Sequence, residues 1–359
     1  MIKKVFRFIM LMLNIIAAIS LLLACLCSFV NPKTIWWIGF FGLGYMYLLA
    51  VNLCFVVFWT FSRKKIYVVI SILTILTGWT FLGRNVQIFE KEIPEDKLSE
   101  SFKILSFNVQ GFEQMRNKES NDNIFDFIRT EDADIICLQE FVNFRWKIFD
   151  EKFINKQFEN TPFSHFELPG KHFGIATYSK FPIISKDLVF SDNTTNACMC
   201  SDIIMGNDTI RVYNIHLKSV GFNNDERHLL DNFVKKEYDE SDMQKIKSIF
   251  QNLRKSSLER EKQVNILTAH IEQSPYPVII CGDFNDPPTS FSYRKVCGNR
   301  NDAFIEAGAG RSTTYNIGRI ASLRIDYIMY SDIFKAYSYE SPRVQLSDHF
   351  PVMCRLVKK

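Results

Sequence analysis

The first 89 residues of this 359-residue chain contain no aspartate and no glutamate. They hold eight lysines and arginines, so the rest of the chain carries 35 of the 43 basic residues and all 39 acidic residues. The formal net charge of +4 therefore hides a basic, apolar front and a mildly acidic body. An acidic body lacks the broad positive field that supplies most nonspecific affinity for nucleic acid, which argues mildly against tight DNA binding.

Other expected signals are also missing. The nine cysteines show neither the spacing of a zinc site nor that of a disulfide framework. Cys198 and Cys200 are too close in sequence for an ordinary disulfide. The G-x-S-x-G motif is absent, which disfavours a serine hydrolase.

The acid-free front contains three long apolar runs, at residues 8–30, 35–61 and 66–82. Runs of about 17–25 residues are long enough to cross a bilayer as helices. We therefore predict that residues 1–89 form a membrane region with a bundle of three transmembrane helices, which would contact the lipid bilayer; buried core helices are the alternative. Residues 90–101 are charged, contain a proline and are predicted to form a linker.

The basic residues of the front predict its orientation. Residues 3–7 hold two lysines and an arginine, and residues 63–65 are all basic, whereas the link between the first two runs has only Lys33. Because basic loops stay cytoplasmic, we expect a multi-pass protein with a cytoplasmic N-terminus and an extracytoplasmic body. The stretch "LLAC" at 22–25 resembles a lipoprotein cleavage site, so processing at Cys25 is an alternative, although two further spans make it unnecessary.

The body alternates apolar strand-like runs with helix-like stretches, including 120–130 and about 242–273. A hairpin is predicted through residues 206–208. This mixture predicts an α/β (α+β) fold with mixed sheets in a layered sandwich. The stretch 217–245 interleaves acids and bases, which is typical of a solvated helical insertion, with a substrate-selecting lid as the alternative.

Polar side chains end several apolar strands of the body. Side chains alternate between the faces of a strand, so Glu140 shares a face with Ile136 and Leu138, and Asn285 shares one with Asp283. Each polar residue alone could be structural, as a turn residue, a helix cap or a core histidine. Together they indicate a site at one edge of the sheets, because ligands gather at the carboxyl ends of strands. The residues in this pattern are Asn108, Glu140, His216, Asp283, Asn285, Asp326, Asp348 and His349.

The residue types at this edge favour one kind of chemistry. Carboxylate and amide oxygens suit Mg²⁺ or Mn²⁺. His349, with Asp326 available to orient it, has the arrangement of a base held by a carboxylate. A hard metal ion, a base and hydrogen-bond donors together suit the attack of water on phosphorus.

Six short motifs carry a family resemblance. In order, "SFNVQ", "LQE", "YNIHL", "GDFND", "RIDYI" and "SDHFP" resemble the endonuclease/exonuclease/phosphatase superfamily over residues 102–358. The resemblance implies a four-layered sandwich of two mixed β-sheets flanked by helices, and a catalytic domain at 102–359. It also implies a divalent-metal-dependent phosphoesterase site.

The resemblance also implies a role for each residue. Glu140 is the chief metal ligand with Asn108 nearby, and Asp348 helps with metal or water. Asp283, as acid or base, and Asn285 handle the water and the phosphate oxygens. His349, paired with Asp326, is the catalytic histidine, and His216 contacts phosphate. Abasic-site enzymes have Asn in place of His216 and Asp in place of Gln110, so this chain departs from that branch.

The resulting hypothesis is a membrane-anchored, Mg²⁺-dependent phosphodiesterase or phosphatase, with Mn²⁺ as an alternative ion, acting outside the cytoplasm. Its substrate would be a lipid headgroup or a nucleic acid, and no obligate protein partner is inferred. The alternatives are a nuclease for extracellular DNA or RNA and a catalytically silent binding protein of the same fold. A transporter would need polar groups within the spans, for which Asn14 and Asn52 are the main candidates.

Overall fold

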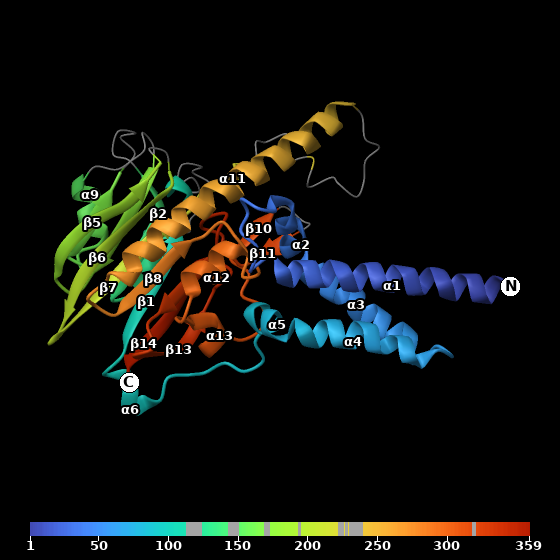
Figure 1. Ribbon diagram of the computed structural model, residues 1–359. Helices are drawn as coiled ribbons and strands as arrows, with labels where there is room; N and C mark the ends of the chain where they lie inside the picture. Colours follow the sequence, from blue (N-terminus) through green and yellow to red (C-terminus); the bar gives the residue numbers. More distant parts are fainter. Residues whose placement is uncertain are drawn as a thin grey trace.

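The structure is a computed structural model in which two six-stranded sheets are stacked between helices, with an apolar helical bundle projecting from one side (Figure 1). It describes residues 1–112, 124–142, 151–168, 173–192, 195–221, 226, 229, 240–317 and 321–359. The predicted sandwich of two mixed β-sheets flanked by helices is confirmed.

The first sheet has the strand order β13-β14-β1-β2-β4-β3. Only β1 and β2 run parallel among its pairs; the other pairs are antiparallel. Helices α8 (Ile124–Glu131) and α9 (Glu151–Gln157) belong to its outer side, where Phe125 and Ile128 pack with Leu105 and Leu138. The strands are β1 (Phe102–Asn108), β2 (Ile135–Val142), β3 (Phe163–Glu167), β4 (Phe173–Ser179), β13 (Phe334–Glu340) and β14 (Val352–Lys358).

The second sheet has the order β5-β6-β7-β8-β12-β9, and β7 and β8 are its parallel pair. Helix α11 (Glu240–Glu272) covers its outer face together with α12 (Phe291–Cys297), which confirms the predicted long polar helix. The hairpin predicted at 206–208 is also present, since β6 and β7 pair across it. The strands are β5 (Ile183–Ser191), β6 (Ala197–Met205), β7 (Asp208–His216), β8 (Val278–Asp283), β9 (Asn301–Asp302) and β12 (Asp326–Tyr330).

The inner faces of the two sheets form one buried core. Ile104 and Cys137 from the first sheet pack with Val212, Ile279 and Ile328 from the second. These side chains are fully buried, so each isoleucine and valine among them contributes about 1.5–3 kcal/mol of hydrophobic stabilisation. The core fixes the distance between the sheets and therefore places the strand ends of both at one common edge.

Among the described residues, α1 (Ile2–Leu26) is long and apolar enough to span a membrane. The next two apolar runs are broken rather than continuous. Trp36–Leu43 meets α3 (Tyr45–Thr60) at 61°, and Lys65–Thr77 meets α5 (Trp79–Asn85) at 60°. The sequence predicted three transmembrane helices; among the described residues the structure has one helix long enough to be a span, and two bent helix pairs in place of the other two. Glycines at 44 and 78 stand at the two bends.

Buried polar side chains link the helices of the apolar bundle. Asn14 of α1 donates to Ser71 of α4 (Val68–Thr77) at 2.6 Å and accepts from Trp59 of α3 at 2.8 Å. Asn52 of α3 donates to the Ala17 carbonyl at 3.0 Å. Both asparagines that a transporter would have used are thus engaged in helix–helix hydrogen bonds, a common means of association in an apolar medium.

The bundle contacts the sandwich through shorter elements. Ser28 donates to the Thr289 carbonyl at 2.6 Å, and Thr289 donates to the Gly42 carbonyl at 2.9 Å. Lys33 forms an ion pair with Glu261 of α11 at 2.8 Å. The remaining elements are η1 (Trp36–Ile38), α2 (Gly39–Leu43), η2 (Lys65–Tyr67), α6 (Glu95–Leu98), η3 (Gln110–Phe112), α13 (Ala303–Ala307), β10 (Tyr315–Ile317) and β11 (Ala321–Leu323).

Candidate active site

The strand register brings the predicted residues to one edge of the sandwich. Strands β7 and β8 end together, with His216 paired to Asp283. Strand β12 is antiparallel to β8, so its first residue, Asp326, lies opposite Asp283. Strand β14 is antiparallel to β1, so the residues before it return to the end of β1. The prediction that the "SDHF" stretch reaches the same edge is borne out by this register.

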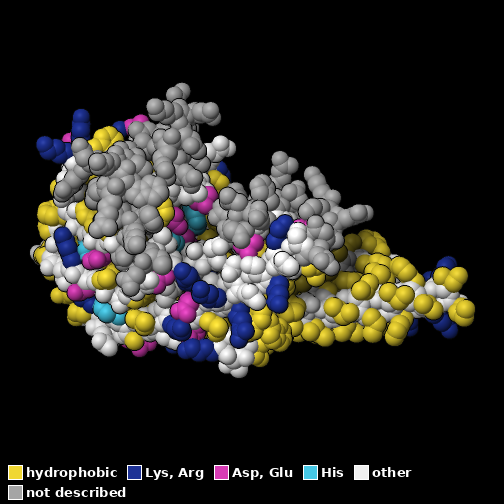
Figure 2. All heavy atoms as spheres, turned by 90° about the horizontal axis from the view of Figure 1, so that it is seen from above, with side chains coloured by type: hydrophobic (Ala, Val, Ile, Leu, Met, Phe, Trp, Pro, Cys, Tyr) yellow, Lys and Arg dark blue, Asp and Glu magenta, His cyan; other side chains and the backbone are white. Residues whose placement is uncertain are grey.

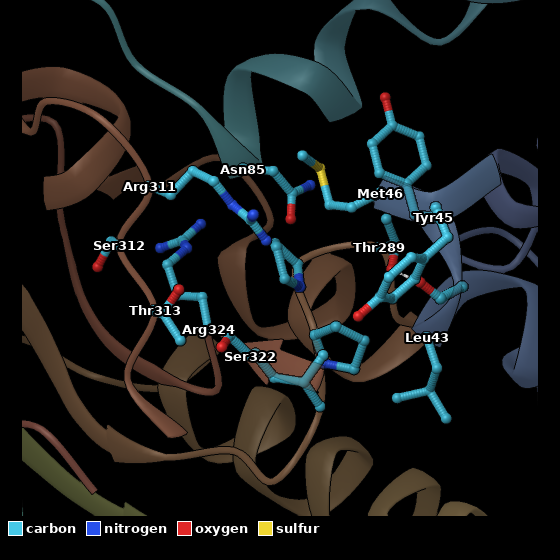
Figure 3. Close-up of a pocket in the computed structure, with 15 residues that line it drawn as sticks. Leu43, Tyr45, Met46, Asn85, Thr289, Arg311, Ser312, Thr313, Ser322 and Arg324 are labelled. Atoms are coloured by element: carbon cyan, nitrogen blue, oxygen red, sulfur yellow. Dashed lines mark hydrogen bonds between the residues drawn. The ribbon is translucent and has the colours of Figure 1, made fainter. Parts of the chain in front are cut away.

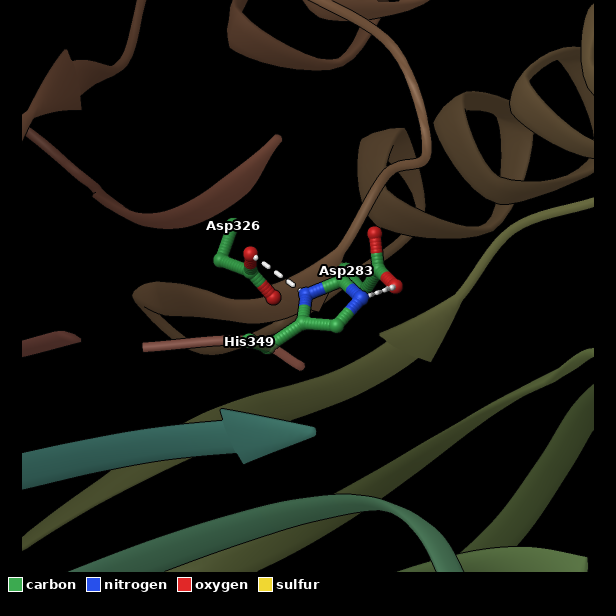
Figure 4. A group of neighbouring side chains, drawn as sticks. All are labelled: Asp283, Asp326 and His349. Atoms are coloured by element: carbon green, nitrogen blue, oxygen red, sulfur yellow. Dashed lines mark hydrogen bonds and ion pairs between the residues drawn. The ribbon is translucent and has the colours of Figure 1, made fainter. Parts of the chain in front are cut away.

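His349 lies between two buried carboxylates (Figure 4). Its Nδ1 is 3.0 Å from Asp326 Oδ2, and its Nε2 is 3.6 Å from Asp283 Oδ2. All three side chains are buried. The Tyr315 ring lies over the imidazole, with centroids 4.6 Å apart. The histidine is therefore held in one orientation by a hydrogen bond on one side and a ring on its face.

The pKa values of this trio move in the directions that suit proton transfer. Burial alone would lower the pKa of His349, but the charges of Asp326 and Asp283 outweigh it and raise that pKa to about 10. Burial, reinforced by the charge of Asp326, raises the pKa of Asp283 to about 6. At neutral pH the imidazole is therefore an imidazolium, and Asp283 is a carboxylate with its pKa close to the working range of a general base.

Glu140 reaches this edge because strand β2 is irregular there. The regular alternation of side chains along a strand does not predict this position. Its neighbours Ile136 and Leu138 face the outer core of the first sheet, so a regular strand would carry Glu140 outward. The pairing of β2 with β4 shifts register between Gln139 and Phe141, and Glu140 has a φ of 52°. This bulge turns the carboxylate inward, to 3.4 Å from the Asn108 Nδ2.

Asn108 and Asn285 surround the Asp283 carboxylate with donors. Asn108 Nδ2 donates to Asp283 Oδ2 at 3.1 Å, and the backbone N–H of Asn285 donates to Asp283 Oδ1 at 2.7 Å. Asn285 lies beyond the end of β8 with a φ of 51°, so it is in a turn and not on the strand face that its parity predicted. Its amide nitrogen also donates to the Leu217 carbonyl at 3.1 Å.

His216 and Asp348 complete the predicted set. The His216 Nδ1 donates to the Thr195 carbonyl at 2.8 Å, so Nε2 faces Glu140 at 3.6 Å and Asp283 at 3.7 Å. Within the described part of the chain, this buried Nε2 has no hydrogen-bond partner. Asp348 is half-buried beside His349, and its backbone N–H donates to Gln110 Oε1 at 3.3 Å.

Several supporting residues escaped the sequence reasoning. Gln139 donates to Asn214 at 2.8 Å, which joins the two sheets beneath the site. Thr314 Oγ1 accepts from the Asp326 N–H at 3.1 Å, and Ser347 donates to the Asn108 carbonyl at 2.8 Å. Gln139 and Asn214 lie within the quoted motifs. A search for polar residues on the buried faces of the predicted strands would have found them. Nothing in the sequence around Thr314 signals its role.

The chemistry of this donor set fits a hard divalent cation. The Glu140 side chain is 24% exposed and reachable from solvent, and it lies next to an amide and to the unpartnered Nε2 of His216. Oxygen donors of this kind suit Mg²⁺ or Mn²⁺. Asp283, Asp326 and His349 also place ligand atoms within 4.8 Å of one another. Both ring nitrogens of His349 already face the carboxylates of Asp326 and Asp283, however, so Glu140 and Asn108 are the better candidates.

A family comparison agrees with this geometry. The profile of the Endonuclease/Exonuclease/phosphatase family matches residues 105–349. The chain belongs to this family. Members of the Endonuclease/Exonuclease/phosphatase family hydrolyse phosphoester bonds and generally depend on divalent metal ions. Residues 4–85 match a separate profile described as a domain of unknown function, DUF8431. A comparison with curated proteins found no match.

Solved structures share the fold of this family member at low sequence identity. Truncated TDP2 from Caenorhabditis elegans superimposes with a TM-score of 0.50 at 18% identity, covering 73% of this chain and 100% of that one. A humanized TDP2 from D. rerio gives 0.51 at 13%, covering 72% and 99%. D. rerio TDP2 in complex with a single-strand DNA product gives 0.50 at 12%, covering 71% and 98%. These likenesses bear on the fold.

Proposed function

We propose that the protein is a membrane-anchored, divalent-metal-dependent phosphoesterase that hydrolyses its substrate by metal- and histidine-assisted attack of water. The observation that carries the proposal is the His349 imidazole, which lies between Asp326 and Asp283 at the edge where Glu140 also turns inward. A cation held by Glu140 and Asn108, with Asp348 near, would withdraw charge from the phosphoryl oxygens.

The side chains divide the remaining work. Asp283 takes a proton from the attacking water, because it is ionised at neutral pH and its pKa of about 6 keeps it basic enough. His349, held as an imidazolium by Asp326, donates a hydrogen bond to the phosphoryl group as negative charge develops. His216 and Asn285, which both contact Asp283 Oδ2, would contact the phosphate group on that side of the site. In this assignment Asp283 is the general base, whereas His349, expected from the sequence to be the base, stabilises negative charge on the phosphoryl group.

The membrane part of the proposal follows from exposed apolar surface. Figure 2 shows the bundle covered by hydrophobic side chains, with lysines and arginines at its far tip. Large apolar side chains such as Phe8, Ile16, Leu53 and Leu73 are exposed there. Exposed surface of this kind needs lipid or a partner to cover it. We infer that α1 and the two bent pairs each cross the bilayer.

The bundle geometry also supports the proposed orientation. The N-terminus and the turn between α3 and α4 lie at the end of the bundle remote from the sandwich (Figure 1). Residues 3–7 and 63–65, the two basic stretches, therefore share one side, which would be cytoplasmic. The catalytic edge would then be extracytoplasmic. Alkaline phosphatase fused after residue 95 should be active in cells, and green fluorescent protein at the same position should be dark; the opposite pair of results would reverse the topology.

A panel of phosphate esters tests the function. The full-length chain in detergent should hydrolyse bis-p-nitrophenyl phosphate in Mg²⁺ or Mn²⁺ and lose the activity in EDTA. Phospholipids and single-stranded DNA, tested in parallel, would then assign the substrate class. A complex of D. rerio TDP2 holds a single-strand DNA product, which keeps a nuclease as the second candidate. Failure to hydrolyse any of these esters in either metal would contradict the proposal and leave a silent binding protein.

A further inference from the structure

A hollow lies where the apolar bundle meets the sandwich (Figure 3). It is open to solvent, has about 40 Å³ of water-accessible space, and is lined by residues other than those of the candidate active site. Leu43, Tyr45 and Met46 form its wall on the bundle side, whereas Arg311, Thr313 and Ser322 form the wall on the sandwich side. The hollow is therefore amphipathic, with Leu43 and Met46 on the bundle side and both charged side chains on the sandwich side.

The charge of the lining is positive. Arg311 and Arg324 are the charged residues among the fifteen that line the hollow, and none of the fifteen is acidic. Arg324 is buried and donates to both oxygens of Asp302, so its charge is already balanced. Arg311 is exposed, and no carboxylate of the described residues lies within ion-pair distance of it. An anion in the hollow would meet one uncompensated guanidinium, a group well suited to phosphate.

With the bundle inserted as proposed, the hollow would lie at the depth of lipid headgroups. Aromatic side chains that favour membrane interfaces occur at this end of the bundle, in Trp36, Trp37, Tyr45 and Tyr47. Tyr45 begins α3, the helix that leads away from the sandwich into the apolar bundle. A ligand here would have acyl chains on the bundle side and solvent on the other, as a membrane lipid has.

The walls of the hollow continue into the candidate active site. Pro287 and Pro288 line it and follow Asn285 by two and three residues. On another wall, Ser322 and Leu323 belong to β11, which pairs with β10, and Tyr315 of β10 covers the His349 ring. The hollow and the catalytic histidine thus both contact one two-stranded ribbon.

We propose that this hollow binds the phosphate headgroup of an anionic membrane lipid, with Arg311 as its main contact. The inference rests on the proposed membrane insertion, but it assigns a binding site apart from the catalytic edge. The bound lipid would brace the β10–β11 ribbon and the loop after β8 against the bundle. Leu43 and Met46 would contact the glycerol and acyl part, which favours a lipid over a free phosphate.

Lipid retention tests the proposal without relying on turnover. The full-length chain would be placed in nanodiscs of equal parts phosphatidylcholine and phosphatidylglycerol, released, and its retained lipids identified by native mass spectrometry. We expect preferential retention of phosphatidylglycerol, and a loss of about fivefold in Arg311→Gln, as for one basic residue near an anionic surface. Ser322→Glu, which adds a carboxylate to the hollow and keeps Arg311, should lose as much.

Two further variants serve as controls. Arg311→Lys should retain most of the lipid because it keeps the charge. Lys186→Gln removes an exposed cation on β5 and should behave as wild type. Equal retention by wild type, Arg311→Gln and Ser322→Glu would overturn the proposal, as would displacement of the lipid by soluble glycerol phosphate at matched concentration. Normal turnover with no lipid preference would reject the hollow and leave the proposed function standing.

Discussion

Asp326 and His349 form a buried hydrogen-bonded pair, with the Asp326 Oδ2 3.0 Å from the His349 Nδ1. The bond aims the other ring nitrogen at Asp283, 3.6 Å away. Asp326 also lies directly opposite Asp283 in the sheet, so one register fixes the spacing of all three side chains. The orientation and the charge of the imidazole both depend on this carboxylate.

We expect Asp326→Asn to lower kcat by about 100-fold while KM changes little, because the amide can hold the ring but cannot stabilise its positive charge. Steady-state kinetics of the purified full-length chain would measure both constants. Asp332→Asn, at an exposed position, is the matched control and should be unchanged. An Asp326→Asn variant with wild-type kcat would rule out this role for the pair.

The pH dependence of kcat should be bell-shaped. Asp283 must be deprotonated to accept a proton, so the rate should rise as pH increases through its pKa of about 6. His349 must be protonated, so the rate should fall as pH increases through its pKa of about 10. In Asp326→Asn the alkaline limb should move to lower pH, because the charge that raises the His349 pKa is removed. A profile that rises only near pH 10 would instead identify His349 as the base.

Glu140→Gln should weaken metal activation. Replacing a carboxylate ligand with an amide removes one charge from the site, and we expect the Mg²⁺ concentration for half-maximal activity to rise by about tenfold or more. Titration of activity with Mg²⁺ would measure this shift. Glu131→Gln, on α8 and paired with Lys103, is a suitable control and should leave the titration unchanged. An unaltered titration in Glu140→Gln would place the ion elsewhere.

Gly282→Ala should destabilise the domain strongly. Gly282 has a φ of 139°, and a Cβ there would lie 2.0 Å from the Ile215 carbonyl oxygen of the neighbouring strand. We expect a loss of about 3 kcal/mol in the free energy of unfolding, because backbone must move. Gly206→Ala also takes a positive φ but meets no atom within 4 Å, so it should cost about 1 kcal/mol. Denaturant unfolding would compare them, and equal losses would contradict the steric argument.

The fold was predictable from local pattern. Apolar runs bounded by turn residues marked the strands, and the polar ends of those runs marked the catalytic edge. The alternation of side chains correctly predicted that His216 and Asp283 face the site, because β7 and β8 are regular and parallel up to their last residues. The antiparallel return of β14 was also a direct consequence of chain direction.

The positions of two site residues could not be predicted from the alternation of side chains along a strand. Glu140 depends on the bulge in β2, and Asn285 depends on a turn that begins where β8 ends. Both have positive φ, which a rule based on alternation cannot represent. Asp286 is turned away and pairs with Arg260 of α11 at 3.2 Å. The bends at the two glycines of the bundle could not be predicted either. Hydropathy gives the length of an apolar run but not the direction of the helices within it.

The 217–245 stretch falls largely outside the described residues, so its role as an insertion or a lid stays a prediction. Its C-terminal end joins α11, and Arg260 of α11 donates to the carbonyl of Lys218, at the N-terminal end of the stretch, at 2.8 Å. Domain limits at 89 and 101 also stay predictions. The contacts of Ser28 and Arg84 with residues 288–289 show that the two regions touch at the loop that follows β8 and carries Asn285.

The central claim is that this edge of the sandwich hydrolyses phosphate esters with a divalent cation and His349. The most direct measurement is the hydrolysis of bis-p-nitrophenyl phosphate by the full-length chain in Mg²⁺ and after chelation, with His349→Gln beside the wild type. We predict activity that disappears on chelation, returns with added Mg²⁺, and falls by about 100-fold or more in His349→Gln. Turnover that survives both chelation and the substitution would contradict the account.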